Sequence, residues 1–456
     1  MRVVGQSAAQ LFREVQMLVY ESVNSQSDVM REKARHLIPG GSHTYAKGDD
    51  QYPEQAPGFL VRGEGSHVWD VDGKEYIEYG MGLRAVTLGH AFGPVIEAVA
   101  AQLPLGTNFT RPAPIEIECA EELLDLLPGA EMVKFCKDGS MAVDGAIKLA
   151  RAFTGRDMIA ICGDHPFFST NDWFIGKTDM PGGIPGWVCQ QTVKFRYNDI
   201  ASLEALFDRH PRQIAGVVME AARTEEPRTG FLENVKACAH RNGAVFILDE
   251  MITGFRWHLR GAQYVYGVTA DLSTFGKALA NGFSVSALTG RREIMRLGGW
   301  DHDRERVFLL STTHGAETHG LAAAIATMKF YKQHPVVEGL YARGERLRRG
   351  LQRVTAELKL EPHFNLMSRD CNLIFGTRDS EGKPSQAFRT LFMQELVIRG
   401  VIAPSFVVSY SHTEVDIDRT IEAASEALAV YRKGLEDGVE KYLKGQSVKP
   451  VFRRFA

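Results

Sequence analysis

The lysine at position 277 stands in the stretch STFGKALANGF, where an ammonium group is out of place. It follows Phe275-Gly276 and precedes a run of small residues, so its side chain lies between two apolar segments punctuated by glycine. Burial lowers the pKa of a lysine, and an unprotonated amine is a nucleophile toward an aldehyde. Lys277 is therefore a candidate nucleophile, and a solvated lysine on a surface loop is the alternative.

Two adjacent carboxylates, Asp249 and Glu250, end the apolar run in FILDEMITGFR, so a buried strand delivers both to its polar end. Successive residues of a strand point to opposite faces, which argues against an acid/base pair. A buried carboxylate needs a partner because its unpaired burial is costly. We expect Glu250 to form a structural salt bridge with Arg256 or Arg260, whereas Asp249 needs a separate explanation.

The stretch VKFCKDGSMAVDGAIKLA leads an apolar strand into the turn Asp138-Gly139-Ser140, where a helix opens. The free N–H groups and the positive end of that helix would hold a phosphate, with the Ser140 hydroxyl as a further donor. The same residues also suit an ordinary helix N-cap. A phosphate cradle, an acid at a strand end and a nucleophilic lysine are together what the cofactor pyridoxal 5'-phosphate (PLP) requires.

Short apolar runs alternate with helical patterns through the middle of the chain. The runs cover residues 132–136, 158–162, 214–220, 244–250, 271–276 and 284–290. This alternation predicts an α/β fold with a mostly parallel central sheet, in which ligands bind at the carboxyl ends of the strands. After about residue 320 the pattern changes to α+β, and the hairpin predicted in WDVDGKEYIEYG is expected to pack beside this C-terminal part.

The length of 456 residues suits two domains with a cleft, and 44% apolar with 24% charged residues is typical of a soluble globular protein. A net charge of -3 argues against a nucleic-acid partner. The six cysteines lack paired spacing, which argues against a disulfide framework and a zinc site, so no metal is expected. No secretory signal and no apolar run of roughly 20 residues is found, so we expect a cytoplasmic enzyme away from the membrane.

These motifs resemble those of class III, fold type I PLP-dependent aminotransferases, most of all the glutamate-1-semialdehyde 2,1-aminomutases. The resemblance runs through IPGG, VWDVDGKEYIEY, LGH, KLARAFTGRD, GAVFILDEMITGFR, GAQYVYGVTADLSTFGKALANG and IAPS, and so covers nearly the whole chain. It implies a large PLP-binding α/β domain over residues 91–324 and a small α+β domain built from residues 31–90 and 325–456. A helical segment would occupy residues 1–30.

The resemblance also implies roles for individual residues. Lys277 would form the Schiff base with the cofactor and act as general base, and Asp249 would pair with the pyridine nitrogen. Gly139 and Ser140 match the phosphate-binding turn. The other expected cofactor contacts are Met251 against one face of the ring, His165 or Phe167 in GDHPFF as the stacking residue, and Glu220.

A further role that the resemblance implies involves a second subunit. Thr312 lies in STTHGAE, which matches the segment in which a threonine reaches the phosphate of the neighbouring subunit. The resemblance therefore implies a homodimer with shared active sites.

The substrate-binding stretches depart from those of the aminomutases. The arginine expected after PGG is absent from SHTYAKG, where Ala46 or Lys47 is nearest its place, and IAPSFVVSYSH lacks the substrate-facing glutamate. Arg84, in GMGLRAVTLGH, is our hypothesised anchor for a carboxylate or other anion, with Lys47 as a helper. A salt bridge between Arg84 and Glu78 is the alternative.

We expect an aminotransferase that moves an amino group between an amine donor and a small aldehyde or keto acceptor, such as an amino-acid semialdehyde or a sugar. An intramolecular aminomutase is the alternative. A nicotinamide dehydrogenase would share the α/β pattern, but no G-x-G-x-x-G follows any strand here. A catalytically silent protein of this fold would be expected to have lost Lys277 or Asp249, and both are present.

Overall fold

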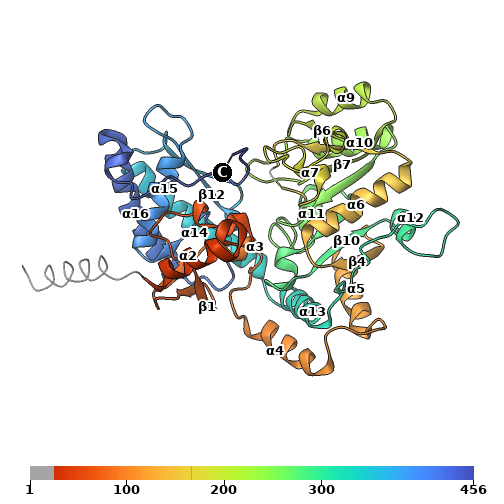
Figure 1. The fold of residues 1–456 in the computed structure, drawn as a ribbon, viewed down its shortest axis with the longest axis horizontal. Coiled ribbons are helices and arrows are strands. Elements are labelled where there is room, and N and C mark those ends of the chain that lie inside the picture. Colours follow the sequence, from red (N-terminus) through yellow and green to blue (C-terminus); the bar gives the residue numbers. More distant parts are fainter. Residues whose placement is uncertain (1–24, 166, 456) are drawn as a thin grey trace, which may run out of the picture.

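Seven strands form the central sheet of the computed structural model, which describes residues 25–165 and 167–455 (Figure 1). Their order is β4-β10-β9-β8-β7-β5-β6, and β10 runs antiparallel to both neighbours while the other pairs are parallel. The strands are β4 (Met132–Cys136), β5 (Met158–Cys162), β6 (Thr192–Phe195), β7 (Ile214–Met219), β8 (Val245–Asp249), β9 (Leu272–Phe275) and β10 (Ser286–Gly290). The predicted α/β class with a mostly parallel sheet is confirmed.

All of these strands except β6 coincide with an apolar run predicted from the sequence. The β6 strand has only four residues, and its exposed Lys194 interrupts the apolar pattern. The central strand β8 shows why the others read as continuous apolar runs. Its residues Val245 and Ile247 enter one hydrophobic cluster, whereas Phe246 and Leu248 enter another, so both faces of the sheet are buried.

Helices cover both faces of this sheet (Figure 1). The long helix α6 shares the cluster of Val245 and Ile247, and α9 and α10 share that of Phe246 and Leu248. A third cluster joins α4, α5 and α13 to the β9–β10 end of the sheet. The bounds are α4 (Gly93–Gln102), α5 (Pro114–Leu126), α6 (Gly139–Thr154), α9 (Ile200–Arg209), α10 (Phe231–Arg241) and α13 (Thr318–Gln333).

A second sheet joins the two ends of the chain. Its order is β1-β2-β3-β13, with strands β1 (Leu60–Glu64), β2 (His67–Asp70), β3 (Glu75–Glu78) and β13 (Val401–Ile402). The β2–β3 hairpin pairs in parallel with β13, which confirms that it packs beside the C-terminal part. Around it lie the hairpin β11 (Phe364–Met367) and β12 (Ile374–Thr377) and the helices α14 (Val336–Glu357), α15 (Gln386–Ile398) and α16 (Glu414–Asp437).

Figure 1 shows the early helix α2 (Gln26–Leu37) beside these C-terminal helices. Residues 1–24 of the helical segment predicted over residues 1–30 lie outside the described part of the chain, and the predicted boundaries at residues 90 and 325 stay predictions. The remaining helices are α3 (Met81–Arg84), α7 (Asp172–Ile175), α8 (Gly186–Gln190), α11 (Gly261–Tyr266) and α12 (Arg292–Met295). Among residues 25–165 and 167–455, no helix has the length and apolar character needed to cross a bilayer.

Candidate active site

Three parallel neighbours, β7, β8 and β9, end at the same edge of the central sheet and deliver three titratable residues there. Glu220 directly follows β7, Asp249 ends β8, and Lys277 begins the short helix η5 (Lys277–Ala280) after β9. Lys277 has a left-handed backbone with φ of 45°, a conformation that costs a non-glycine residue about 1–2 kcal/mol. The carboxyl edge of a parallel sheet is where ligands bind, so this is the candidate active site.

Asp249 is a buried carboxyl group that no cation in the described residues neutralises by direct contact. Its side chain is 3% exposed, and its Oδ1 accepts hydrogen bonds from the Met251 N–H (2.9 Å) and the Thr274 hydroxyl (3.1 Å). Burial, reinforced by the charge of Glu220, raises the pKa of Asp249 to about 7, although the ammonium of Lys277 opposes this. A cationic ligand group beside Asp249 would therefore be stabilised.

The pKa of Lys277 is shifted in the opposite direction, downward. Burial lowers the pKa of its amine, the charges of Arg84 and Arg223 lower it further, and those of Asp249 and Glu220 oppose them. The lowered pKa favours the neutral amine, the form that attacks a carbonyl carbon or accepts a proton.

Met251 packs closely against the backbone of two loops at this edge. A Cβ added to Gly139 would lie 2.8 Å from the Met251 sulfur, and one added to Gly276 would lie 2.7 Å from it. Both glycines therefore let the chain approach Met251 more closely than any other residue could. The thioether lies between the loop after β4 and the loop that carries Lys277.

Gly139 and Ser140 open helix α6, where N–H groups have no intrahelical acceptor. The N-cap is Asp138, whose carboxylate accepts a hydrogen bond from the Met141 N–H at 2.9 Å. The Ser140 hydroxyl accepts one from the Thr170 N–H at 3.1 Å. The turn thus contains a helix N-cap and also keeps the N–H groups of its first two helical positions available for an anion.

His165 and Phe167 differ in their surroundings. His165 is buried, and its Nδ1 accepts a hydrogen bond from the Glu220 N–H at 3.1 Å. This contact places the ring at the carboxyl end of β7. Burial lowers the pKa of His165, so the imidazole is neutral. Phe167 is 41% exposed and lies edge-on to Phe174.

Arg84 ends an unusual turn, because Met81, Leu83 and Arg84 all have positive φ angles together with Gly82. The Arg84 side chain donates from Nε to Asn372 Oδ1 (2.9 Å) and from Nη2 to the Ser405 hydroxyl (3.3 Å). Burial, followed by the charge of Arg223, lowers its pKa to about 10, so Arg84 is still a cation at neutral pH. Both hydrogen-bond acceptors are neutral.

The sequence matches the family model described as Aminotransferase class-III over residues 49–361. The chain belongs to the class III aminotransferases. It is 31% identical to a 3-aminobutyryl-CoA aminotransferase of Cloacimonas acidaminovorans, over 89% of this chain and 97% of the relative. It is 32% identical to a glutamate-1-semialdehyde 2,1-aminomutase of Desulforamulus reducens, over 89% of this chain and 98% of the relative.

Solved structures agree with this assignment. The PLP-bound FumI protein of Sphingopyxis sp. MTA144 superposes with a TM-score of 0.83 and 27% identity, over 91% of this chain and 98% of that one. An omega-transaminase from Sphaerobacter thermophilus superposes with a TM-score of 0.80 and 26% identity, over 91% and 99%. The protein is therefore a PLP-dependent enzyme with the predicted fold type I.

The residues of this aminotransferase fit the cofactor. The buried carboxyl group of Asp249 suits a protonated ring nitrogen, and the lowered pKa of Lys277 suits an amine that bonds to an aldehyde. The open N–H groups of Gly139 and Ser140 suit a phosphate. The individual roles of these residues stay predictions.

One expectation about a charged residue of the aminotransferase is wrong. Glu250 forms no ion pair with Arg256 or Arg260; it accepts hydrogen bonds from the N–H groups of Ala262 (2.8 Å) and Gln263 (2.9 Å) in the first turn of α11 and from the Thr253 hydroxyl. The backbone donors at a helix start take the place of the expected arginine.

The alternative salt bridge between Arg84 and Glu78 is also absent from the described residues. Both carboxylate oxygens of Glu78 accept from the Met81 N–H, at 2.8 and 2.7 Å, and one of them contacts His90 Nε2 at 3.1 Å. Glu78 therefore fixes the left-handed turn that carries Arg84 and leaves the guanidinium to other partners.

Two of the predicted residues have side chains that are exposed to solvent. Lys47 is exposed in the short helix η2 (Tyr45–Lys47), and its charge is not among the leading influences on Lys277 or Arg84. Thr312 is exposed in the segment before α13.

Sequence reasoning did not single out Arg223 as a candidate site residue. Its only signal in the sequence was its place three residues after Glu220, which directly follows a strand.

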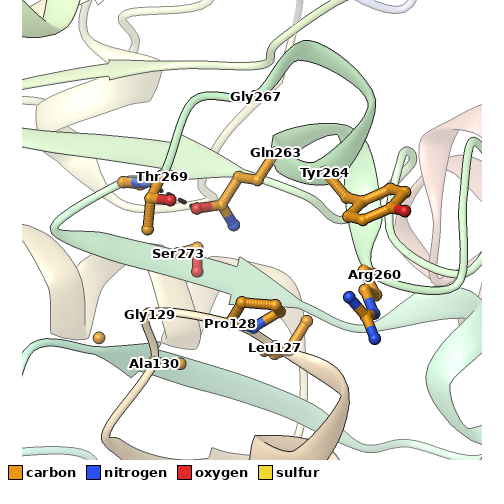
Figure 2. A pocket seen from close by; sticks show the side chains of 12 residues that line it. Leu127, Pro128, Gly129, Ala130, Arg260, Gln263, Tyr264, Gly267, Thr269 and Ser273 are labelled. Atoms are coloured by element: carbon orange, nitrogen blue, oxygen red, sulfur yellow. Dashed lines mark hydrogen bonds between the residues drawn. The ribbon is translucent and has the colours of Figure 1, made fainter.

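A cavity of about 300 Å³ lies at the opposite end of the parallel strands, by their amino ends (Figure 2). Ser273, near the start of β9, and Gly290, at the end of the antiparallel β10, line it. Gln263 also lines it and accepts a hydrogen bond from the Ala270 N–H at 2.7 Å. Since Lys277 follows the far end of β9, this cavity is separate from the candidate active site.

Proposed function

We propose that this enzyme transfers an amino group between a carboxylate-bearing amine donor and a small aldehyde or keto acceptor. The environment of Arg84 is the observation that supports a carboxylate on the substrate. Its charge acts on Lys277, and its hydrogen bonds to Asn372 and Ser405 fix it without neutralising it. A cation held in this way suits an anionic substrate group, such as the carboxylate of an amino-acid semialdehyde, better than an uncharged sugar.

The chain supplies binding, orientation and proton transfer. When bound, PLP supplies an aldehyde that condenses with amines and a ring that withdraws electrons from the substrate Cα. Lys277 Nζ, whose lowered pKa favours the neutral amine, would take a proton from the donor Cα and, in the second half-reaction, would deliver one to the acceptor carbon. Asp249 would hold the ring nitrogen in its protonated form. Arg84 orients the substrate through its carboxylate.

An isotope experiment separates an aminotransferase from an aminomutase. Holoenzyme is incubated with ¹⁵N-labelled 3-aminobutanoate, whose carbon skeleton is chosen from the similarity to a 3-aminobutyryl-CoA aminotransferase, and with a panel of unlabelled keto acids and semialdehydes. Mass spectrometry should find the label in the amine formed from an acceptor. Glutamate-1-semialdehyde supplied with a labelled bystander amine, and converted without uptake of label, would instead establish the aminomutase reading.

The function also includes a homodimer in which Thr312 contacts the phosphate bound by the partner subunit. The exposed position of Thr312 is compatible with a contact to another chain. Light scattering should give the mass of two chains, and Thr312→Ala should weaken PLP binding without changing that mass. A monomeric holoenzyme with full activity would contradict this part.

A further inference from the structure

Arg223 lies three residues beyond Glu220, on the loop that leaves the carboxyl end of β7. Its side chain is half-buried and forms no hydrogen bond or ion pair within the described part of the chain. Its loop leaves the strand end that carries the buried Glu220, and its charge is among those that lower the pKa values of Arg84, His165 and Lys277.

The backbone on both sides of Arg223 is fixed. The Ala221 carbonyl accepts a hydrogen bond from the Tyr197 hydroxyl at 2.8 Å, and the Thr224 carbonyl accepts one from the Ser368 N–H at 3.1 Å. The first contact ties the loop to the large sheet and the second ties it to the C-terminal part. Ser368 lies in the same segment as Asn372, which accepts a hydrogen bond from Arg84, so the Arg223 loop and the Arg84 side chain contact one stretch of the C-terminal part.

The acids nearest in sequence bind elsewhere. Glu226 forms two hydrogen bonds of 2.8 Å with Arg369, and Glu225 accepts one from Asn198 at 3.4 Å. A surface arginine would ordinarily share such acids, but Arg223 does not.

Arg84 and Arg223 face the same two acids, Glu220 and Asp249, at the carboxyl ends of the strands. Arg84 and Arg223 repel each other, and Glu220 is the acid whose charge opposes this at Arg84. Glu220 is itself buried, and its Oε2 has no hydrogen-bond partner in the described structure. A half-buried guanidinium without a partner, whose charge also acts on Arg84, is stabilised by a bound anion.

We propose that Arg223 is a second substrate-binding residue, which together with Arg84 holds the carboxylate of the amine substrate. This rests on the proposed function and deepens it. The two arginines come from different parts of the fold, Arg84 from the turn after β3 and Arg223 from the loop after β7. The substrate class is an amine that carries a carboxylate a short chain away, since Lys277 must reach the amine-bearing carbon while both arginines reach the carboxylate.

Kinetics on a matched pair of donors test the proposal. The pair is 3-aminobutanoate and 2-aminobutane, in which a methyl group replaces the carboxylate. Arg223→Gln should raise KM for 3-aminobutanoate by about 10–100-fold, the value of a charged hydrogen bond. KM for 2-aminobutane and both kcat values should change little, and Arg223→Lys should recover part of the loss. Arg228→Gln, an exposed arginine on the same loop, is the control and should leave all values unchanged.

A binding measurement separates this proposal from the proposed function. Butanoate, which has the carboxylate and no amine, is titrated into wild-type, Arg223→Gln and Arg228→Gln holoenzyme by calorimetry. Butanoate binding that is weaker to Arg223→Gln alone supports the proposal. This holds even if wild-type enzyme transfers no amine from either donor, because the absence of transfer would refute only the proposed function.

Three outcomes would overturn the proposal. In the first, KM rises equally for both donors, which indicates a structural role. In the second, butanoate does not bind or binds the wild type and Arg223→Gln equally. In the third, Arg223→Gln loses the visible PLP absorption but keeps the preference for 3-aminobutanoate over 2-aminobutane. That result would indicate that Arg223 binds the cofactor and not the substrate. A double variant with Arg84→Gln should lose less than the sum of the two single losses, because both residues bind one anion.

Discussion

The side chain of Asn281 joins the loop that follows Lys277 to the loop that follows Arg84. Its Oδ1 accepts a hydrogen bond from the Leu88 N–H at 2.9 Å, and its Nδ2 donates one to the Gly89 carbonyl at 3.0 Å. Asn281 is buried and has a φ of 44°, a left-handed conformation that asparagine tolerates better than most residues. One amide group therefore links the loop of Lys277, the proposed catalytic lysine, to the loop of the proposed substrate anchor.

Asn281→Ala should destabilise the protein, since it leaves the Leu88 N–H and the Gly89 carbonyl buried without partners. We expect a loss of about 1–3 kcal/mol in the free energy of unfolding from the unsatisfied groups. Urea denaturation of the variant measures it, with Asn234→Ala on the exposed surface of α10 as the control. Equal midpoints for the two variants would show that the link contributes nothing.

Lys277→Ala should remove nearly all turnover. The neutral amine of Lys277 is the proposed proton carrier at the substrate Cα, and positioned general bases contribute about 10²–10⁴-fold. Steady-state assays with 3-aminobutanoate measure the loss. Borohydride reduction of the wild-type holoenzyme should label the peptide that contains Lys277, and Lys433→Ala, at an exposed position of α16, should keep full activity. A label on any other lysine would contradict the assignment.

Asp249→Asn should lower kcat and also change how stability depends on pH. In cofactor-free protein the raised pKa of Asp249, about 7, means that the folded state binds this proton more tightly than the unfolded state. Its contribution to stability is therefore present below about pH 4 and is lost as pH rises to about 7.

The Asn variant lacks this titration, so its stability should fall less over the same range. If Asp249 pairs with a protonated ring nitrogen, as proposed, PLP should raise Tm at pH 8 more in the wild type than in Asp249→Asn. Thermal denaturation with and without PLP at pH 5 and pH 8 measures both effects. Identical PLP-induced shifts in the two proteins would argue against a ring contact by Asp249.

The sequence predicted those parts of the fold and site that depend on local patterns. Buried strands appear in the sequence as apolar runs. The strand β6 was not predicted, because Lys194 interrupts its short apolar run. The strand-end positions of Asp249 and Lys277 followed from the same patterns. Side-chain partners did not follow, because Glu250 is satisfied by backbone N–H groups that lie 12 and 13 residues further along. Arg223 carries no motif, and the proposal made for it depends on the position that the fold gives to the loop after β7.

Glu250→Gln tests the corrected role of that residue. The carboxylate accepts from two backbone N–H groups and a hydroxyl, whereas an amide offers one acceptor and presents its own donor to them. We expect a loss of about 1–3 kcal/mol in stability from the unmet donors. PLP absorption and KM should be close to wild type in the folded variant, unlike in Asp249→Asn. A loss of PLP at full stability would contradict a structural role.

His67 makes stability depend on pH near neutrality. Its Nε2 lies 2.9 Å from Asp416 Oδ1 and its Nδ1 lies 2.6 Å from Glu75 Oε1, so the imidazole connects β2 to the first turn of α16. The hydrogen bond to Asp416 is the main cause of the raised pKa of His67, and burial opposes it. For Asp416 burial alone would raise the pKa, but hydrogen bonds from His67 and Thr413 lower it overall, so this carboxylate stays ionised while His67 titrates.

A histidine with a raised folded-state pKa contributes stability that is complete below its ordinary pKa near 6.5 and disappears as pH rises through the folded value. His67→Gln should therefore be less stable than wild type at pH 6, by about 1–3 kcal/mol for a charged hydrogen bond, and the difference should shrink by pH 9. The exposed Glu75 adds little because solvent screens it. Urea midpoints of both proteins at pH 6, 7, 8 and 9 measure the trend. A difference that stays constant or grows with pH would show that His67 contacts Asp416 as a neutral ring, which would contradict the prediction.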